Sequence, residues 1–285
     1  MSRQFKLFDI LSDESTEENV IYDFVFETFT DDERNDIVWE EEIEYLCQAV
    51  DHIVGLLQFY DANGITLDNI GSNVTKIGNY AFYGCTSLTS VTIPSSVTSI
   101  GTYAFYGCSS LAGTLTIPTS VTSIGNYAYY NCNSITTIEL PEQLTSLGNF
   151  AFAECDGITT LTVPTTLTTI GSHSFANCKG LKTIDFESGY LGEYMFANCS
   201  GIEELVIPNN VSASPEGCFY KCTGLKTLTF SGDFEAVGDY GFYGCTNLTT
   251  IIIPEGVEII NDYTFYGCNR LASITIPNSV TSVGQ

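Results

Sequence analysis

The stretch Leu88-Thr-Ser-Val-Thr-Ile-Pro-Ser-Ser-Val-Thr-Ser-Ile-Gly-Thr-Tyr-Ala-Phe-Tyr-Gly-Cys108 decides the fold, because variants of it recur along the chain. Nine copies of about 23 residues run from Val74 to the C-terminus, and a cysteine marks the register of each at positions 85, 108, 132, 155, 178, 199, 222, 245 and 268. A fixed period of this length is typical of a solenoid, in which each repeat forms one turn of a coil.

Each repeat carries three segments with different apolar spacing. Residues 88–93 have the alternation of a short strand, and the proline that follows suits a strand end because it cannot donate to a ladder. Residues 97–101 predict a second extended piece. Residues 104–108 place apolar side chains at i and i+3, which is the spacing of one helical or 3₁₀ turn.

These columns resemble the BspA-like leucine-rich repeat family. Its unit is similar to Leu-x-x-Val-x-Ile-Pro-x-x-Val-x-x-Ile-Gly-x-x-Ala-Phe-x-x-Cys, as it stands in residues 88–108, and the resemblance covers about residues 74–284. It departs at Ser214 and Pro215, which replace the expected Ile-Gly, and in the repeat after Cys178, which is two residues short.

The resemblance implies an α/β repeat solenoid that is curved and right-handed, with a parallel sheet on its concave face. It also implies a module for adhesion or protein binding, often at a cell surface. It implies no chemistry, so no catalytic residue carries over, and we expect no enzyme activity.

Residues 1–64 lie outside the repeats, which we assign to residues 65–285. Thr30-Asp-Asp-Glu33 is typical of a capping box, and a mainly helical cap is expected to cover the open end of the solenoid or to bind a partner helix. Residues 1–30 fit either a hairpin or short helices. The predicted amphipathic helix follows 4,3 spacing through Trp39, Ile43, Leu46, Val50, Ile53, Leu57 and Tyr60.

The final repeat is incomplete at Gln285, because the aromatic and cysteine segment that should follow is missing. The chain is therefore interpreted as a fragment, or as an open end that associates end to end with another copy or with a partner.

Charge narrows the range of partners. The net charge is −25, and residues 1–73 carry 18 acidic and 3 basic residues against 16 and 6 in residues 74–285. Such a chain should repel nucleic acid and anionic lipid, while basic partners or cations remain compatible with it. The same charge also favours solubility.

No stretch approaches the apolar length of a membrane span, and residues 1–11 lack the long apolar run of a signal peptide. The sequence alone therefore predicts a cytoplasmic protein without membrane insertion, whereas the resemblance favours the cell surface.

Histidine and cysteine give no sign of catalysis. Nine of the 11 cysteines share one inward column, which predicts buried, reduced thiols rather than disulfides or a metal site. Cys218 falls in a neighbouring column of small residues, and His173 replaces a tyrosine in an aromatic column. We find no nucleotide-binding or hydrolase motif, and therefore expect neither a metal nor a cofactor.

Two outward columns are candidate binding surfaces. Tyrosines at i and i+3 flank the core aromatic residue in most repeats, as Tyr80 and Tyr83 do, and they either bind a protein or glycan or pack on one another from repeat to repeat. We favour packing, because stacked aromatic rings readily satisfy one another. The pattern fails between Ala153 and Ala197, so any aromatic binding site would be discontinuous.

The second surface is the outward side of the predicted strands, which is rich in threonine. In leucine-rich repeats this is the usual concave binding surface, and we therefore expect a protein or cell-surface ligand here. Threonine also suits a solvated strand. The candidate ligand-binding residues are Thr92, Thr116, Glu139, Thr160, Thr162, Thr183, Asp185, Glu204, Thr227 and Thr229.

Three functions fit these surfaces. The first is an adhesin, the second is an intracellular scaffold that uses the N-terminal helix and the solenoid, and the third, more remote, is an ice-binding threonine array. The array is interrupted, which weakens the ice-binding interpretation, at Glu139, Asp185, Glu204, Val206 and Ile252.

Overall fold

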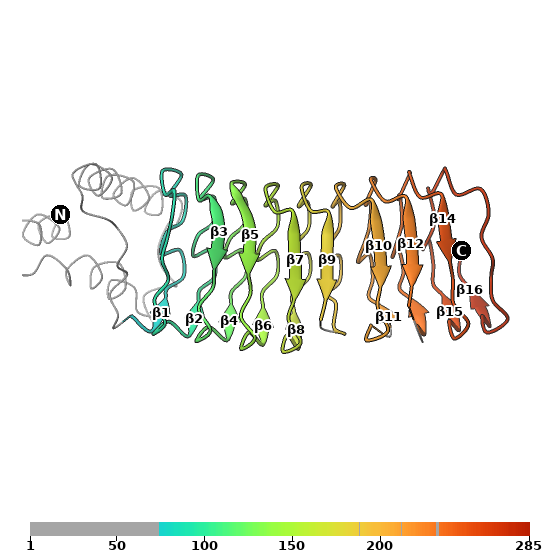
Figure 1. The fold of residues 1–285 in the computed structure, drawn as a ribbon, viewed down its shortest axis with the longest axis horizontal. Helices are drawn as coiled ribbons and strands as arrows, with labels where there is room; N and C mark the ends of the chain where they lie inside the picture. The colour runs from blue at the N-terminus through green and yellow to red at the C-terminus, as the bar shows by residue number, and fades with distance from the viewer. Residues whose placement is uncertain (1–73, 188, 212, 232–233) are drawn as a thin grey trace, which may run out of the picture.

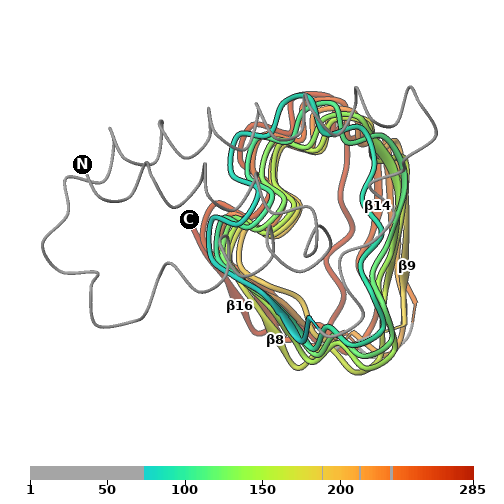
Figure 2. The ribbon, with the colours of Figure 1, turned by 90° about the vertical axis from the view of Figure 1, so that its left-hand side faces the viewer.

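The structure is a computed structural model that describes residues 74–285 except 188, 212 and 232–233. Each repeat forms one rung, and the rungs lie side by side in sequence order (Figure 1). Viewed from the end, the rungs superimpose, with β9 (Thr183–Phe186) and β14 (Thr250–Ile252) on one side and β8 (Thr169–Ile170) and β16 (Ser282–Val283) on another (Figure 2). The predicted solenoid is confirmed.

The longer strands form one side of the solenoid, which we call the strand face. Every pairing in it is parallel, in one sheet from β3 to β9 and a second from β10 to β14. The two sheets separate at the short repeat after Cys178. The bounds are β3 Gly113–Thr116, β5 Ile135–Glu139, β7 Thr160–Val163, β9 Thr183–Phe186, β10 Glu204–Ile207, β12 Thr227–Phe230 and β14 Thr250–Ile252.

A second side consists of two-residue strands, which confirm the second extended piece. Their bounds are β1 Lys76–Ile77, β2 Ser99–Ile100, β4 Ser123–Ile124, β6 Ser146–Leu147, β8 Thr169–Ile170, β11 Ala213–Ser214, β13 Ala236–Val237, β15 Ile259–Ile260 and β16 Ser282–Val283. The glycine after most of these strands permits close stacking of rungs. A side chain on Gly125 would place its Cβ only 2.6 Å from the backbone nitrogen of Thr102.

The third side, which we call the turn side, contains the segment in which a helical turn was expected. That expectation is wrong, since the described residues contain no helix. Phe105 N donates instead to Ala128 O in the next rung at 2.7 Å. Tyr103 and Gly107 have φ values of 57° and 71°, and left-handed residues so close together prevent a helix from propagating.

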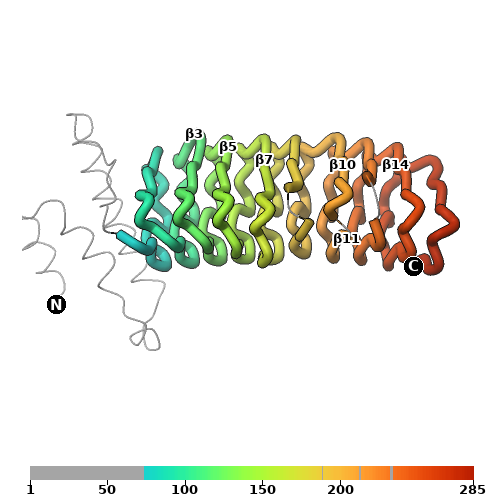
Figure 3. The backbone as a smooth tube through the Cα atoms, turned by 60° about the horizontal axis from the view of Figure 1, so that its bottom comes forward, coloured from blue at the N-terminus to red at the C-terminus, as the bar shows by residue number. Residues whose placement is uncertain are grey.

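These findings correct the predicted fold class. Within the described residues the chain is a β-solenoid of stacked coils rather than an α/β solenoid. Figures 1 and 3 show the rungs in a nearly straight row, so the expected curvature is not seen either. The helical cap in residues 1–64 and the boundary at residue 65 lie outside the described residues, and the right-handed sense stays a prediction.

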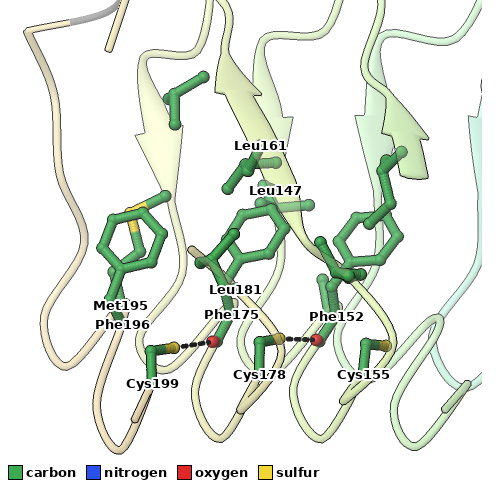
Figure 4. Packing of buried hydrophobic residues seen from close by; sticks show 14 of the residues in the cluster. Leu147, Phe152, Cys155, Leu161, Phe175, Cys178, Leu181, Met195, Phe196 and Cys199 are labelled. Atoms are coloured by element: carbon green, nitrogen blue, oxygen red, sulfur yellow. Dashed lines mark hydrogen bonds between the residues drawn. The ribbon is translucent and has the colours of Figure 1, made fainter. Parts of the chain in front are cut away.

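The core lies between the three sides and consists of stacked apolar columns. Phe152, Phe175 and Phe196 are almost fully buried, and their ring centroids lie 5.4 and 6.0 Å apart in succession (Figure 4). Burying one such side chain contributes about 1.5–3 kcal/mol. Each rung therefore depends on its neighbours to cover its aromatic ring.

The cysteine column binds the rungs together through the backbone. Cys178 Sγ donates to Phe152 O, and Cys199 Sγ donates to Phe175 O, both at 3.2 Å (Figure 4). The same bond to the preceding rung recurs at Cys108, Cys132, Cys155, Cys222, Cys245 and Cys268. Cysteine suits this column because it is a small apolar side chain that still carries a weak donor.

Candidate functional site

The strand face carries nine of the ten residues predicted to bind ligand. Seven of them are exposed, namely Thr116, Glu139, Thr160, Thr162, Thr183, Asp185 and Glu204, while Thr227 and Thr229 are half-buried. Thr92 is also exposed, but its segment is not assigned as a strand. The alternation predicted from the sequence is therefore present in β7, where Thr160 and Thr162 are exposed and Leu161 and Val163 are buried.

Strand register brings these residues into rows that cross the rungs. Thr160 pairs with Thr183, and Thr162 pairs with Asp185, in the parallel ladder between β7 and β9. In the second sheet, Glu204 pairs with Thr227. Directly opposite residues in a ladder lie close enough for their side chains to interact, so each row is a contiguous polar strip.

Few of the hydroxyl groups on the strand face are used within the protein. Thr116 Oγ1 donates to Glu139 Oε2 at 2.8 Å. Among the described residues, no hydrogen bond joins the hydroxyls of Thr92, Thr160, Thr162, Thr183, Thr227 or Thr229 to another protein group. These hydroxyls are available to water or to a ligand.

Threonines elsewhere behave differently. Thr98 Oγ1 donates to Thr75 O at 3.1 Å, and Thr145 Oγ1 donates to Thr122 O at 3.1 Å, in each case reaching the preceding rung. Thr249 does the same with Lys226 O. Threonine in these columns links the rungs, whereas the hydroxyls of Thr160, Thr162 and Thr183 on the strand face do not.

Two carboxylates of the strand face form no ion pair with a described residue, whereas carboxylates beside the face do. Lys226 Nζ lies 2.7 Å from Glu203 Oε2, and Lys179 Nζ lies 3.2 Å from Asp156 Oδ2. Within the described part of the chain, no ion pair includes Asp185 or Glu204. These two acids therefore give the face negative charge that no neighbouring lysine neutralises.

The prediction omitted two exposed apolar side chains on the same face. Val206 is 56% exposed and Ile252 is 63% exposed, and both pair with Thr229, which lies between them. The alternation in the sequence already placed both side chains on the outward side of their strands, but their apolar character did not suggest a binding role. They make the second sheet less polar than the first.

The aromatic side chains of the turn side stack on one another from rung to rung. Tyr80, Tyr103 and Tyr127 have ring centroids 5.0 and 4.9 Å apart, with interplanar angles of 10° and 5°. Tyr83 and Tyr106 stack in a second row at 4.9 Å. The interpretation of these columns as packing is confirmed, since each ring covers the face of the next.

The row of Tyr83 and Tyr106 is interrupted where the sequence indicated. Ala153, Ala176 and Ala197 take the place of tyrosine and are at most 2% exposed. Tyr130, Phe150, Tyr194 and Tyr220 pack against them. The alanines therefore form a small buried cluster under neighbouring rings.

The cysteine column has no features of a reactive site. Burial raises the pKa of the Cys155, Cys178 and Cys222 thiols well above their usual value, because desolvation disfavours the thiolate. Reactive cysteines have a lowered pKa and an exposed sulfur instead. Within the described residues, no group of His, Cys, Asp or Glu has the arrangement of a metal site.

Comparison with known proteins agrees with the repeat columns. The profile of the BspA type leucine rich repeat region matches residues 53–182, 111–213 and 189–285, with 6 copies. The chain therefore belongs to the BspA-type leucine-rich repeat family, which is typically non-enzymatic. No curated protein sequence matches the chain significantly.

Solved structures of bacterial repeat proteins are similar to this chain. A leucine-rich repeat protein from Bacteroides ovatus is 33% identical, with a TM-score of 0.66, over 74% of this chain and 55% of that one. The pneumococcal vaccine antigen PcpA is 23% identical, with a TM-score of 0.56, over 75% of this chain and 57% of that one, and this likeness shows the fold alone. The chain thus spans little more than half of the length of these two proteins.

The sequence prediction that the chain has no membrane span can be compared with the described part of the structure. Among the residues that the structure describes, no helix is long and apolar enough to cross a membrane.

Proposed function

We propose that the chain is a non-enzymatic binding module that holds a protein ligand against its strand face. One observation carries this proposal: the hydroxyls of Thr160, Thr162 and Thr183 make no hydrogen bond to other described groups, although threonines in other columns link the rungs. A rigid row of exposed donors and acceptors costs little conformational entropy when it binds.

The chemistry of the face supports a polar protein ligand with basic side chains. Asp185 and Glu204 lie on the strand face, and no lysine among the described residues pairs with them. Val206 and Ile252 add an apolar strip beside them in the second sheet. Interfaces commonly combine such an apolar centre with a charged rim, which steers association and excludes wrong partners.

Membership of the family supports the same function. Leucine-rich repeat solenoids commonly serve as surface or binding modules, and long solenoids present extended surfaces. The ice-binding alternative loses support, because Glu139, Asp185, Val206 and Ile252 interrupt the threonine rows.

Lysine substitutions across the strand face test the proposal. Thr162→Lys, Asp185→Lys and Glu204→Lys together reverse the charge of the face, and we expect the partner recovered after chemical crosslinking in the native host to fall at least about tenfold, as loss of about 1.4 kcal/mol would give. The matched variant Glu142→Lys, Thr169→Lys and Glu258→Lys makes the same change in net charge at exposed positions off this face. Equal recovery from both variants would refute the proposal.

Protease treatment of intact cells separates the adhesin from the intracellular scaffold. If an antibody against the repeats loses its signal without cell lysis, the module acts at the surface. Full protection until lysis would instead support the scaffold, in which the same face binds an intracellular partner.

A further inference from the structure

Both sets of strands are interrupted at the same repeat. On the strand face, β9 pairs with β7 and β10 pairs with β12, but among the described residues no ladder joins β9 to β10. On the second side, β8 pairs with β6 and β11 pairs with β13, while residues 190–192 between them form no strand. The described rungs therefore fall into two blocks, the first from β1 to β9 and the second from β10 to β16. We call the boundary between them the junction.

The length of one repeat explains the junction. Successive cysteines of the register are 23 or 24 residues apart, except that Cys178 and Cys199 are separated by 21. Two missing residues remove about 6.6 Å of extended chain. The rung between these cysteines therefore reaches the turn side by a shorter path, and it does not keep the register of its neighbours.

The core is partly uncovered along the junction. On the strand face, Ile184 is half-buried, whereas Leu161 and Leu205 in the same inward column are 2% and 3% exposed. On the second side, Ile170 and Leu191 are half-buried as well, although the inward side chains of β6 and β13 are at most 1% exposed. The rungs therefore pack less closely at the junction on both of these sides.

The turn side, by contrast, is continuous across the junction. Phe175 N donates to Met195 O at 3.0 Å, and Phe196 N donates to Cys218 O at 2.9 Å. Cys199 Sγ adds its bond to Phe175 O (Figure 4). The two blocks therefore stay connected on this side at every rung.

The stacked core rings are loosest at the junction. The ring centroids of Phe175 and Phe196 are 6.0 Å apart and their planes differ by 18°, which are the largest values in this column. Met195 lies beside them, fully buried, where the preceding rungs have Ala151 and Ser174 (Figure 4). Methionine fills irregular spaces because its side chain is unbranched and flexible, so it accommodates small changes in the spacing of these rungs.

One side chain spans the junction at the corner that follows the strand face. Asn210 Nδ2 donates to Phe186 O at 3.1 Å and to Glu187 O at 2.8 Å. At the same position after the proline of its own rung, Thr166 Oγ1 donates to Leu144 O at 2.9 Å. Asn210 therefore limits how far β9 and β10 can separate.

We propose that the junction is a hinge, at which the two blocks bend about the turn side so that β9 and β10 move apart and together, with Asn210 as the contact that restrains the motion. Neighbouring rungs hold a solenoid together, so it bends where one interface is weakest. Here two of the three sides lack a ladder between the blocks, and the third side keeps its bonds. Regions with few backbone hydrogen bonds and a less covered core open at the lowest cost in free energy.

The hinge changes the surface that a ligand meets, and this consequence rests on the function proposed above. Asp185 belongs to the first block, whereas Val206 and Ile252 belong to the second. Bending therefore alters the distance between a charged part and an apolar part of the strand face. A ligand that contacts both parts selects one bending angle.

Electron–electron distance measurements between spin labels test the hinge on the full chain. The labels are attached to p-acetylphenylalanine, which leaves the 11 cysteines unmodified. The exposed pair Thr162 and Ile252 spans the junction over four rungs of the strand face, and the pair Thr92 and Asp185 spans four rungs within the first block. We expect the distance distribution of the first pair to be at least about twice as wide as that of the second.

A third pair tests whether the turn side is the axis. Asn133 and Thr223 are exposed at the end of the turn side and lie four rungs apart across the junction. Their distribution should be as narrow as that of the pair within the first block. Equal widths for both strand-face pairs would overturn the hinge, and a wide distribution for Asn133 and Thr223 would show a junction that is loose on every side, which also overturns it. Since no ligand is present, failure here is distinct from failure of the proposed function.

The restraint is tested with Asn210→Ala. This variant removes the side-chain bonds across the junction, and we expect the distribution of the Thr162 and Ile252 pair to widen further. Thr166→Ala removes the equivalent bond within the first block and should leave that distribution unchanged. Equal effects of the two variants, or no widening in Asn210→Ala, would overturn the role of Asn210 in the hinge.

Discussion

The strand face and the turn side repeat with the same period, but they use their polar groups in opposite ways. On the turn side, Cys178 Sγ donates to the rung before it, and Phe105 N donates to the rung after it. On the strand face, the hydroxyls of Thr160 and Thr162 bond to no other described group. A repeated column therefore indicates a binding surface only when its polar groups are not already used to join the rungs.

We expect alkaline pH to cause the largest loss of folding stability, and to do so through the buried thiols of the turn side. Eight thiols have a raised pKa, chiefly through burial, against an ordinary value of 9.0. Above about pH 9 the unfolded chain loses these protons and the folded chain keeps them, so stability is complete below that pH and falls as pH rises further. Each buried thiol lowers the free energy of unfolding by up to about 1.4 kcal/mol for each pH unit of this rise.

Urea unfolding followed between about pH 7 and pH 10.5 measures this decline. The double variant Cys155→Ser and Cys178→Ser removes two titrating groups and should make the decline shallower. An unchanged slope in this variant, or flat stability across the range, would contradict the role of the buried thiols.

Two single substitutions compare how much the core and the strand face contribute to stability. Phe152→Ala leaves a cavity in the stacked column, and we expect a loss of about 3–5 kcal/mol in the free energy of unfolding. Thr162→Ala, on the strand face of the next repeat, should change it by no more than about 0.5 kcal/mol. Denaturant unfolding of the two variants gives the comparison, and similar losses would show that the strand-face hydroxyl does contribute to stability.

Much of the fold could be predicted because each column combines a fixed period with a fixed side-chain type. The alternation in residues 160–163 set which side chains face outward, and the cysteine register set the rungs. The candidate site was predicted to the same extent, since its residues are the outward members of that alternation. Whether they bind a ligand stays a prediction.

The turn side could not be predicted in detail, because apolar spacing of i and i+3 fits both a helical turn and a bonded turn. The deciding feature is the positive φ of Tyr103, a conformation that bulky residues rarely adopt. In this chain, stacking and bonds between rungs support it.

Photo-crosslinking from two threonines of one repeat tests the central claim most directly. Thr162 in β7 and Thr169 in β8 are both exposed strand residues, on different sides of the solenoid. With a benzoylphenylalanine at either position in the native host, we predict a discrete crosslinked protein from position 162 and none from position 169. Crosslinking from position 169 alone, or equally from both positions, would contradict the assignment of the strand face as the binding surface.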